Sequence, residues 1–187
     1  MSQSLLLQIA RESITEVFEA HTTIKKEELY KTYPVLKEPV ASFITIYLND
    51  ELRGSMGSIT PTRSLLDDII YNAKSAAFED SRFSPLTTSE YLHSSLELSL
   101  LTEPKELTYH TLTDIKEQTK CGEDGLIITL GEKQAAFLPQ IWTQLTSFDE
   151  FFSHLLQEAG LTSDQMSEHP QVFTFQVEKQ IDKPILQ

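Results

Sequence analysis

The chain has 187 residues, 40% of them hydrophobic and 23% charged, which suffices for one well-buried domain or for two lobes that share a core. Its formal net charge of -13 argues against a general binder of nucleic acid or of anionic membranes, because either would need a basic surface. The single cysteine, Cys121, excludes an intrachain disulfide and a cysteine-built metal cage, and it favours a reducing compartment. The apolar stretch near the N-terminus is too short for a signal core, so we expect a cytoplasmic protein.

The first third of the chain predicts a helix and then a strand hairpin. Apolar residues recur at helical spacing over residues 2–20, which predicts an amphipathic helix. Residues 21–38 contain Pro34, are followed by Pro39, and are expected to be irregular, with a short helix around Glu28 to Tyr30. β-Branched and aromatic residues fill 40–48, and Asn49-Asp50 is typical of a turn that returns the chain as a second strand.

The middle of the chain predicts two helices that flank a loop, followed by a strand. Leucine, isoleucine and alanine recur at helical spacing from Leu65 to Ala77, with Thr62 or Ser64 available as the N-cap. The beginning of this helix should lie near Gly57-Ser58, where its free N–H groups would favour an anion. A capping box at 87–90 predicts a short helix to His93, and residues 96–100 alternate as a strand does.

The last third repeats this mixture of helices and strands. We expect a short helix near 113–118, a hairpin of 126–130 with 134–138, and a helix-like piece from Pro139. A second capping box at 147–150 opens another helix, and residues 172–177 form a last strand, after which the tail beyond Lys179 should fray. Hairpins separated by helices predict an α+β fold with a largely antiparallel sheet and flanking helices, in a single domain spanning 1–187.

The stretch 52–58, Leu-Arg-Gly-Ser-Met-Gly-Ser, is the first candidate site. Glycines inside a strand, here Gly54 and Gly57, indicate a bulge or a backbone that another group approaches closely. Arg53 would offer a planar donor fork to a carboxylate or phosphate, with Ser55 beside it. The alternative is a structural bulge whose arginine pairs with a nearby acid.

A second candidate is the polar segment 78–85, with Asp80 and Arg82 between two phenylalanines. In the functional interpretation this segment and Arg53 line one cleft; in the structural one Asp80 caps backbone donors and Arg82 pairs locally. Glu97 lies on the polar side of its strand and would face either water or the cleft that contains Arg53. The five histidines lack the spacings of metal motifs, no phosphate-binding glycine loop occurs, and no cofactor is evident.

Five ordered segments of the chain resemble the AMMECR domain family, which includes protein A of bacterial AmmeMemoRadiSam systems. They are Leu52-Arg53-Gly54-Ser55-Met56-Gly57, Ala76-Ala77-Phe78-Glu79-Asp80-Ser81-Arg82-Phe83, Leu96-Glu97-Leu98-Ser99-Leu100-Leu101, Gly122-Glu123-Asp124-Gly125-Leu126, and Leu138-Pro139-Gln140 with Ala159-Gly160-Leu161. The family usually reads Leu-Arg-Gly-Cys-Ile-Gly in the first segment and Asp-Pro-Arg-Phe in the second. This chain therefore has Ser55 in place of a cysteine and Ser81 in place of a proline.

The resemblance implies a compact α+β protein with a cleft near the Arg-Gly motif, but no particular reaction. It also implies association with a Memo-like protein and a radical-SAM enzyme, and the radical chemistry would belong to that partner, because one cysteine cannot hold an iron–sulfur cluster. We therefore expect either a small polar or anionic ligand, or a non-catalytic partner subunit. The candidate ligand-binding residues are Arg53, Gly54, Ser55, Gly57, Asp80, Arg82 and Glu97.

Overall fold

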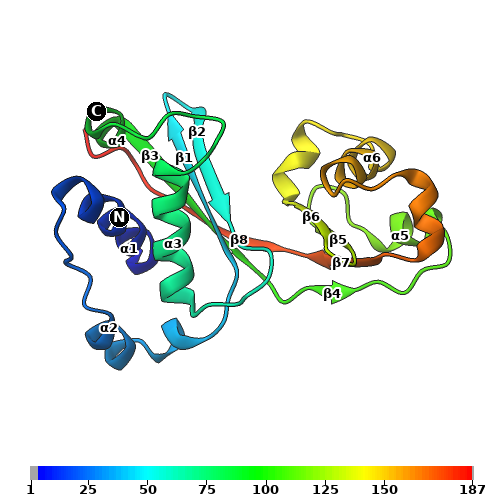
Figure 1. Ribbon diagram of the computed structural model, residues 1–187, viewed down its shortest axis with the longest axis horizontal. Helices are drawn as coiled ribbons and strands as arrows, with labels where there is room; N and C mark the ends of the chain where they lie inside the picture. The colour runs from blue at the N-terminus through cyan, green and yellow to red at the C-terminus, as the bar shows by residue number, and fades with distance from the viewer. Residues whose placement is uncertain (1–3, 187) are drawn as a thin grey trace. The chain divides into compact units, whose positions relative to one another are not determined.

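The computed structural model describes residues 4–186 and confirms the α+β class with antiparallel strand pairing. The strands divide between two four-stranded sheets, ordered β2-β1-β3-β8 and β4-β7-β5-β6. The chain correspondingly forms two compact units, one from the described residues through Leu100 and from Glu178 onward, the other from Leu101–Val177 (Figure 1).

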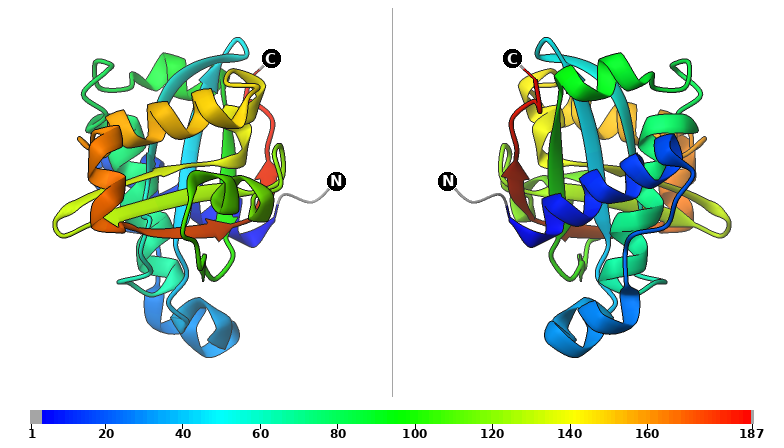
Figure 2. Two further views of the ribbon diagram at one scale, coloured as in Figure 1. Left: turned by 90° about the vertical axis from the view of Figure 1, so that its right-hand side faces the viewer. Right: turned by 90° about the vertical axis from the view of Figure 1, so that its left-hand side faces the viewer.

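The first unit contains the sheet of β1 (Ser42–Leu48), β2 (Glu51–Gly57), β3 (Ser94–Leu101) and β8 (Val177–Ile181). Its helices are α1 (Leu5–Glu19), α2 (Lys26–Thr32), α3 (Leu65–Phe78) and α4 (Thr88–His93), with a 3-10 turn at Pro34–Lys37. Helices α1 and α3 pack on one face of the sheet, where the fully buried Ile14, Leu66, Ile69, Ile44 and Leu98 join one core (Figure 2). Because side chains alternate along a strand, the neighbours of these strand residues occupy the other face.

Helices α3 and α4 begin at N-cap residues that the sequence predicted. The Ser64 hydroxyl accepts a hydrogen bond from Asp67 N–H at the start of α3, and Thr87 forms the predicted capping box with Glu90. At the beginning of α6 (Phe148–Glu158), Ser147 accepts from Glu150 N–H, whereas the Glu150 carboxylate accepts from the Ser147 hydroxyl and not from its backbone. The second predicted capping box is therefore only half formed.

The β1–β2 hairpin turns at Asn49 and Asp50, whose φ angles are 53° and 63°. Two consecutive residues with positive φ are typical of a type I′ turn, which matches the right-handed twist of the flanking strands. The predicted reversal at this dipeptide is confirmed.

We expect Asp50→Gly to be more stable than Asp50→Ala by about 1 kcal/mol, because only glycine adopts the left-handed conformation without steric cost. Urea unfolding of the two variants measures the difference. The matched control is Glu51, the first residue of β2, where the order should invert because glycine is the poorer strand residue. The same order at both positions would contradict this explanation of the turn.

The second unit contains β4 (Lys105–Glu106), β5 (Gly125–Leu130), β6 (Lys133–Phe137), β7 (Gln171–Phe175), α5 (Leu112–Gln118) and α6, with 3-10 turns at Pro139–Thr143 and Ser163–Glu168. Its core gathers Leu126, Ile128 and Val172 from the sheet with Phe151 and Leu155 from α6. Trp142 stacks on Phe151 at 3.7 Å between ring centroids. The predicted 126–138 hairpin and the short helix near 113–118 are confirmed.

Two expectations about the C-terminal region are wrong. The predicted strand 172–177 is two strands, β7 and β8, separated at Gln176 and belonging to different sheets. The segment beyond Lys179 is not frayed: β8 continues to Ile181, and the side chain of Asp182 is only 3% exposed in an ion pair with Arg11. A charged partner far away in sequence holds this tail, and the local pattern carries no sign of it.

The helices of residues 4–186 include none with both the length and the apolar character needed to cross a bilayer.

Candidate functional site

The Leu-Arg-Gly motif lies at a β-bulge. Along the β1–β2 pair, Ile46 is opposite Gly54 while Tyr47 is opposite Leu52, so Arg53 is the extra residue on β2. A bulge disrupts the ladder locally and re-aims the side chain of the extra residue. The bulge predicted from the glycines is confirmed, and Arg53 is the side chain that it redirects.

Arg53 points to the segment that follows α3 and to the start of α4. Its Nε–H donates to Glu90 Oε1 at 2.9 Å, and one terminal nitrogen donates to Glu90 Oε2 at 3.1 Å and to the Ser84 carbonyl at 3.0 Å. The side chain is 12% exposed. Three of the five guanidinium donors are thus used, and the other terminal nitrogen, Nη1, donates to no group among residues 4–186.

The loop after α3 is tied to the same strand. Asp80 Oδ2 accepts a hydrogen bond from Ser55 N–H at 2.9 Å, and the carboxylate also binds Arg82 through Nε at 2.9 Å and a terminal nitrogen at 2.7 Å. The guanidinium carbons of Arg53 and Arg82 lie 5.7 Å and 5.6 Å from the centre of the Phe83 ring. Two guanidinium groups, two carboxylates and one phenyl ring therefore gather at the edge of β2.

Both carboxylates are held in the charged form. Hydrogen bonds from the Arg82 side chain, and then from the backbone N–H groups of Ser55 and Arg82, lower the pKa of Asp80 to about 2 despite its burial. Hydrogen bonds from Arg53 and then from Thr87 lower the pKa of Glu90 to about 2. Two guanidiniums facing two ionised carboxylates leave this edge of the sheet close to electrically neutral at pH 7.

These low pKa values predict an acid-sensitive fold. A carboxyl whose folded pKa is depressed stabilises the fold above its unfolded pKa, near 4, and loses that contribution as the pH falls towards the folded value of about 2. We expect the Asp80 contribution, about 2 kcal/mol, to disappear over this interval. Unfolding measured between pH 6 and pH 2 should therefore show a shallower pH dependence for Asp80→Asn than for the wild type. Parallel curves would contradict the assignment, and Asp164→Asn at an exposed position of the second unit serves as the control.

A row of polar side chains crosses the first sheet on the face opposite α3. Thr45 lies opposite both Ser55 and Glu97, and the Thr45 and Ser55 hydroxyls are 3.1 Å apart. Glu97 is 5% exposed, and its Oε1 lies 3.3 Å from Lys179 Nζ on β8. Burial and the nearby Glu97 charge raise the pKa of the Tyr47 phenol on the same face. We call Ser55, Thr45, Glu97 and Lys179 the polar row.

Gly54 and Gly57 serve close packing. A Cβ atom on Gly54 would lie 2.2 Å from the Ala76 carbonyl oxygen of α3, and one on Gly57 would lie 2.2 Å from the Phe43 ring. Both glycines thus allow another part of the protein to approach the backbone.

The start of α3 does not form the open anion site that the sequence suggested. Asp67 and Asp68 occupy its first turn, and the fully buried Asp68 carboxylate accepts hydrogen bonds from Ser42 and Ser58. The protein's own carboxylates thus fill this position. Among the described residues, no group of three or more histidine, cysteine, aspartate or glutamate side chains could hold a metal ion.

Five of the seven candidate residues, Arg53, Gly54, Ser55, Asp80 and Arg82, come together at the bulge, and Gly57 ends the same strand. Glu97 lies two strands away in the polar row and pairs with Lys179, whereas Arg53 pairs with Glu90. Sequence reasoning missed Glu90, Thr45 and Lys179 as site residues. The capping box placed Glu90 at a helix start, but nothing in the local pattern showed that its carboxylate would also bind Arg53.

Position 55 calls for a small side chain, because its hydroxyl lies 3.1 Å from the Thr45 hydroxyl on β1 and its backbone N–H is held by Asp80 from the loop after α3. We expect Ser55→Cys to melt close to the wild type and Ser55→Leu to lose about 1 to 3 kcal/mol by overpacking. Thermal melts of both variants measure this, with thiol labelling of Ser55→Cys compared with the exposed Cys121. A new thiol far more reactive than Cys121, together with a gain of turnover, would contradict a purely steric role.

Fold and site together define a two-unit α+β protein with a charged, bulged strand end in its first unit. The AMMECR1 family model matches residues 7–180, so the chain belongs to this family. It is 33% identical over 176 residues to a protein of Thermofilum pendens, covering 86% of this chain and 80% of that one. Protein MJ0810 of Methanocaldococcus jannaschii is 32% identical, covering 82% and 79%. The crystal structure of the uncharacterized protein PH0010 from Pyrococcus horikoshii matches with a TM-score of 0.85 at 28% identity, covering 97% of this chain and 92% of that one.

Proposed function

We propose that the protein binds a small polar or anionic ligand at the bulge corner, by which we mean Arg53, Ser55, Asp80 and Arg82. The observation that carries this proposal is the state of Arg53. Its Nε and one terminal nitrogen are held by Glu90 and Ser84, which fixes the plane of the guanidinium while Nη1 keeps two donors for a ligand. A guanidinium oriented in advance loses little conformational entropy when it binds an oxygen atom.

The charge balance of the corner limits the ligand. Asp80 and Glu90 already neutralise Arg82 and Arg53, so a polyanion would meet two carboxylates as well as two guanidiniums. A single carboxylate or phosphate oxygen, or a neutral polar group, needs only the remaining Arg53 donors. The Ser55 hydroxyl on β2, and the other members of the polar row on β1, β3 and β8, offer further hydrogen-bonding groups. These groups can orient a molecule, and they assign no chemical step.

The test compares Arg53→Lys with Arg63→Lys, a charge-preserving control in which the substituted arginine contacts Asp68 and Tyr71 instead. Calorimetric titrations use inorganic phosphate, acetate and succinate, and native mass spectrometry records any molecule retained through purification. We expect one of these ligands to bind the wild type and Arg63→Lys equally and Arg53→Lys at least about tenfold more weakly, since lysine cannot reproduce the planar fork. Equal binding by all three proteins, or no bound molecule and no binding of any probe, would contradict the proposal.

A second candidate function is that of a non-catalytic partner subunit for a Memo-like or radical-SAM protein in the cytoplasm. It is favoured by the environment of Ser55. Among the described residues, the Ser55 hydroxyl is hydrogen-bonded only to the Thr45 hydroxyl and contacts no general base that would activate it as a nucleophile. Affinity purification from the native source tests it. A stable complex that survives Arg53→Ala would favour this candidate, whereas a lone chain that carries a metabolite would count against it.

A further inference from the structure

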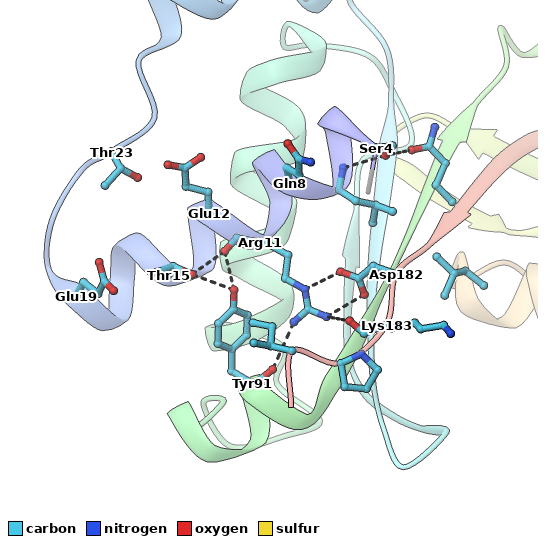
Figure 3. Close-up of a pocket in the computed structure, with 15 residues that line it drawn as sticks. Ser4, Gln8, Arg11, Glu12, Thr15, Glu19, Thr23, Tyr91, Asp182 and Lys183 are labelled. Carbon is cyan, nitrogen blue, oxygen red and sulfur yellow. Dashed lines mark hydrogen bonds and ion pairs between the residues drawn. The ribbon is translucent and has the colours of Figure 1, made fainter. Parts of the chain in front are cut away.

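A long groove in the first unit lies apart from the bulge corner. It has a volume of about 990 Å³ and runs between helix α1 and the C-terminal segment 180–185 (Figure 3). Residues from Ser4 to Glu19 line it, which corresponds to about 22 Å along the helix. An extended peptide of about seven residues has that length. We call it the α1–tail groove.

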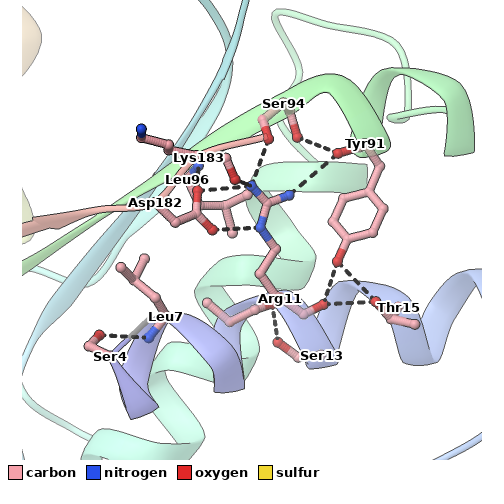
Figure 4. A network of polar contacts seen from close by, with 11 residues as sticks. Ser4, Leu7, Arg11, Ser13, Thr15, Tyr91, Ser94, Leu96, Asp182 and Lys183 are labelled. Carbon is pink, nitrogen blue, oxygen red and sulfur yellow. Dashed lines mark hydrogen bonds and ion pairs between the residues drawn. The ribbon is translucent and has the colours of Figure 1, made fainter. Parts of the chain in front are cut away.

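The floor of the groove is a closed polar network (Figure 4). Arg11 donates to Asp182 at 2.6 Å and 2.8 Å and to the Ser94 carbonyl at 2.6 Å, and Asp182 accepts from Leu96 N–H at 2.6 Å. The Tyr91 hydroxyl donates to the Arg11 carbonyl at 2.9 Å. Because these polar groups are hydrogen-bonded to one another, an occupant would be recognised by the two walls of the groove.

One wall is acidic. Glu12 and Glu19 are exposed and seven residues apart, so they lie two turns apart on the same stripe of α1. Within residues 4–186 neither carboxylate has an ion-pair partner. Lys183 on the other wall extends its side chain away from both glutamates, as Figure 3 shows. A cation entering the groove would therefore meet two carboxylates that no basic residue of the described chain neutralises.

The other wall carries exposed aliphatic side chains and lies at a sheet edge. Ile181 and Ile185 are 62% and 53% exposed, so two aliphatic side chains of this wall remain in contact with solvent. Strand β8 is the outermost strand of its sheet, so one side of its backbone has no strand partner among the described residues. An exposed edge of this kind can pair with an added extended segment.

From these two walls we propose that the α1–tail groove binds an extended segment of another protein in which basic and aliphatic residues alternate. Side chains on successive residues of an extended chain point in opposite directions. Its basic residues then face Glu12 and Glu19, its aliphatic residues face Ile181 and Ile185, and its backbone pairs with the edge of β8. The net charge of -13 on the whole chain adds attraction at a distance.

The test uses a fluorescent peptide of about seven alternating lysine and valine residues, matched to the groove length, and its anisotropy on titration with the full chain. The double variant Glu12→Lys/Glu19→Lys changes the net charge by +4, from -13 to -9. Glu27→Lys/Glu117→Lys makes the same change at exposed glutamates on α2 and α5, outside the groove. A peptide with glutamate in place of lysine, and one N-methylated at alternate residues, complete the set.

We expect one peptide per chain, at least about tenfold weaker binding to the Glu12/Glu19 variant, and wild-type affinity within about twofold for the control pair. The glutamate and N-methylated peptides should bind at least about tenfold more weakly than the lysine–valine peptide. Equal losses in the two variants would show attraction by net charge alone and would overturn the proposal, as would no binding of the lysine–valine peptide. Self-association of the chain that only the groove variant abolishes, without peptide binding, would assign the groove to a second copy and would also overturn it.

Discussion

Replacing Asp182 by alanine should lower the stability of the protein by about 3 to 5 kcal/mol, the largest loss that we expect from a single charged residue. The Asp182 side chain is 3% exposed and that of Arg11 8%, and they meet at 2.6 Å. Removal of the carboxylate leaves the Arg11 guanidinium buried without its counterion and leaves Leu96 N–H without its acceptor. Urea unfolding followed by circular dichroism measures the loss.

Two comparisons separate this explanation from a general sensitivity of the fold. The double variant Arg11→Met/Asp182→Leu should recover much of the loss, because two apolar side chains of similar size leave no buried charge. Glu123→Ala removes one partner of the exposed Lys120–Glu123 pair and should cost less than about 0.5 kcal/mol. If Asp182→Ala cost as little stability as Glu123→Ala, the Arg11–Asp182 ion pair would not be what holds the C-terminal segment.

Gly54→Ala should cost about 3 kcal/mol, because its Cβ would lie 2.2 Å from a backbone oxygen of α3 and no side-chain rotation can relieve the contact. Either β2 or α3 must move. Since Asp80 follows α3 and binds Ser55 N–H on β2, the same movement disturbs the bulge corner. Thermal unfolding and the Ser55 amide signal in an NMR spectrum report both effects.

Gly57→Ala provides the matched comparison on the same strand. Its Cβ would meet the Phe43 ring, a side chain that can rotate away, so we expect a loss of only about 1 to 2 kcal/mol. If Gly57→Ala were the more damaging variant, α3 would not be packed on Gly54 as closely as the structure shows.

Much of the fold follows from local pattern. The Asn49-Asp50 turn, the Ser64 and Thr87 caps and the alternation of Leu96 with Glu97 each reflect interactions within a few residues, and these elements form where the sequence predicts them. Strand β4 has two residues and carries no such pattern, and the division of 172–181 between two sheets depends on pairing with distant strands.

The site follows from the sequence only in part, for a related reason. The glycines at 54 and 57 predict the bulge, and the bulge brings Arg53 to the 80–84 loop. The partners of the charges are long-range, however: Arg53 pairs with Glu90, Glu97 with Lys179 and Arg11 with Asp182. No spacing along the chain encodes such pairs. The sequence alone therefore cannot show whether Arg53 and Glu97 line the same cleft.

The most direct test of ligand binding at the bulge corner is an NMR titration of the isotopically labelled protein with the ligand that calorimetry or mass spectrometry identifies. The signals of Arg53 Nε–H and of the Ser55 and Arg82 amides should shift together, with one dissociation constant, while the Arg63 side-chain signal stays in place. Shifts confined to Arg63, or spread over both units without those three signals, would contradict a binding site at the bulge corner.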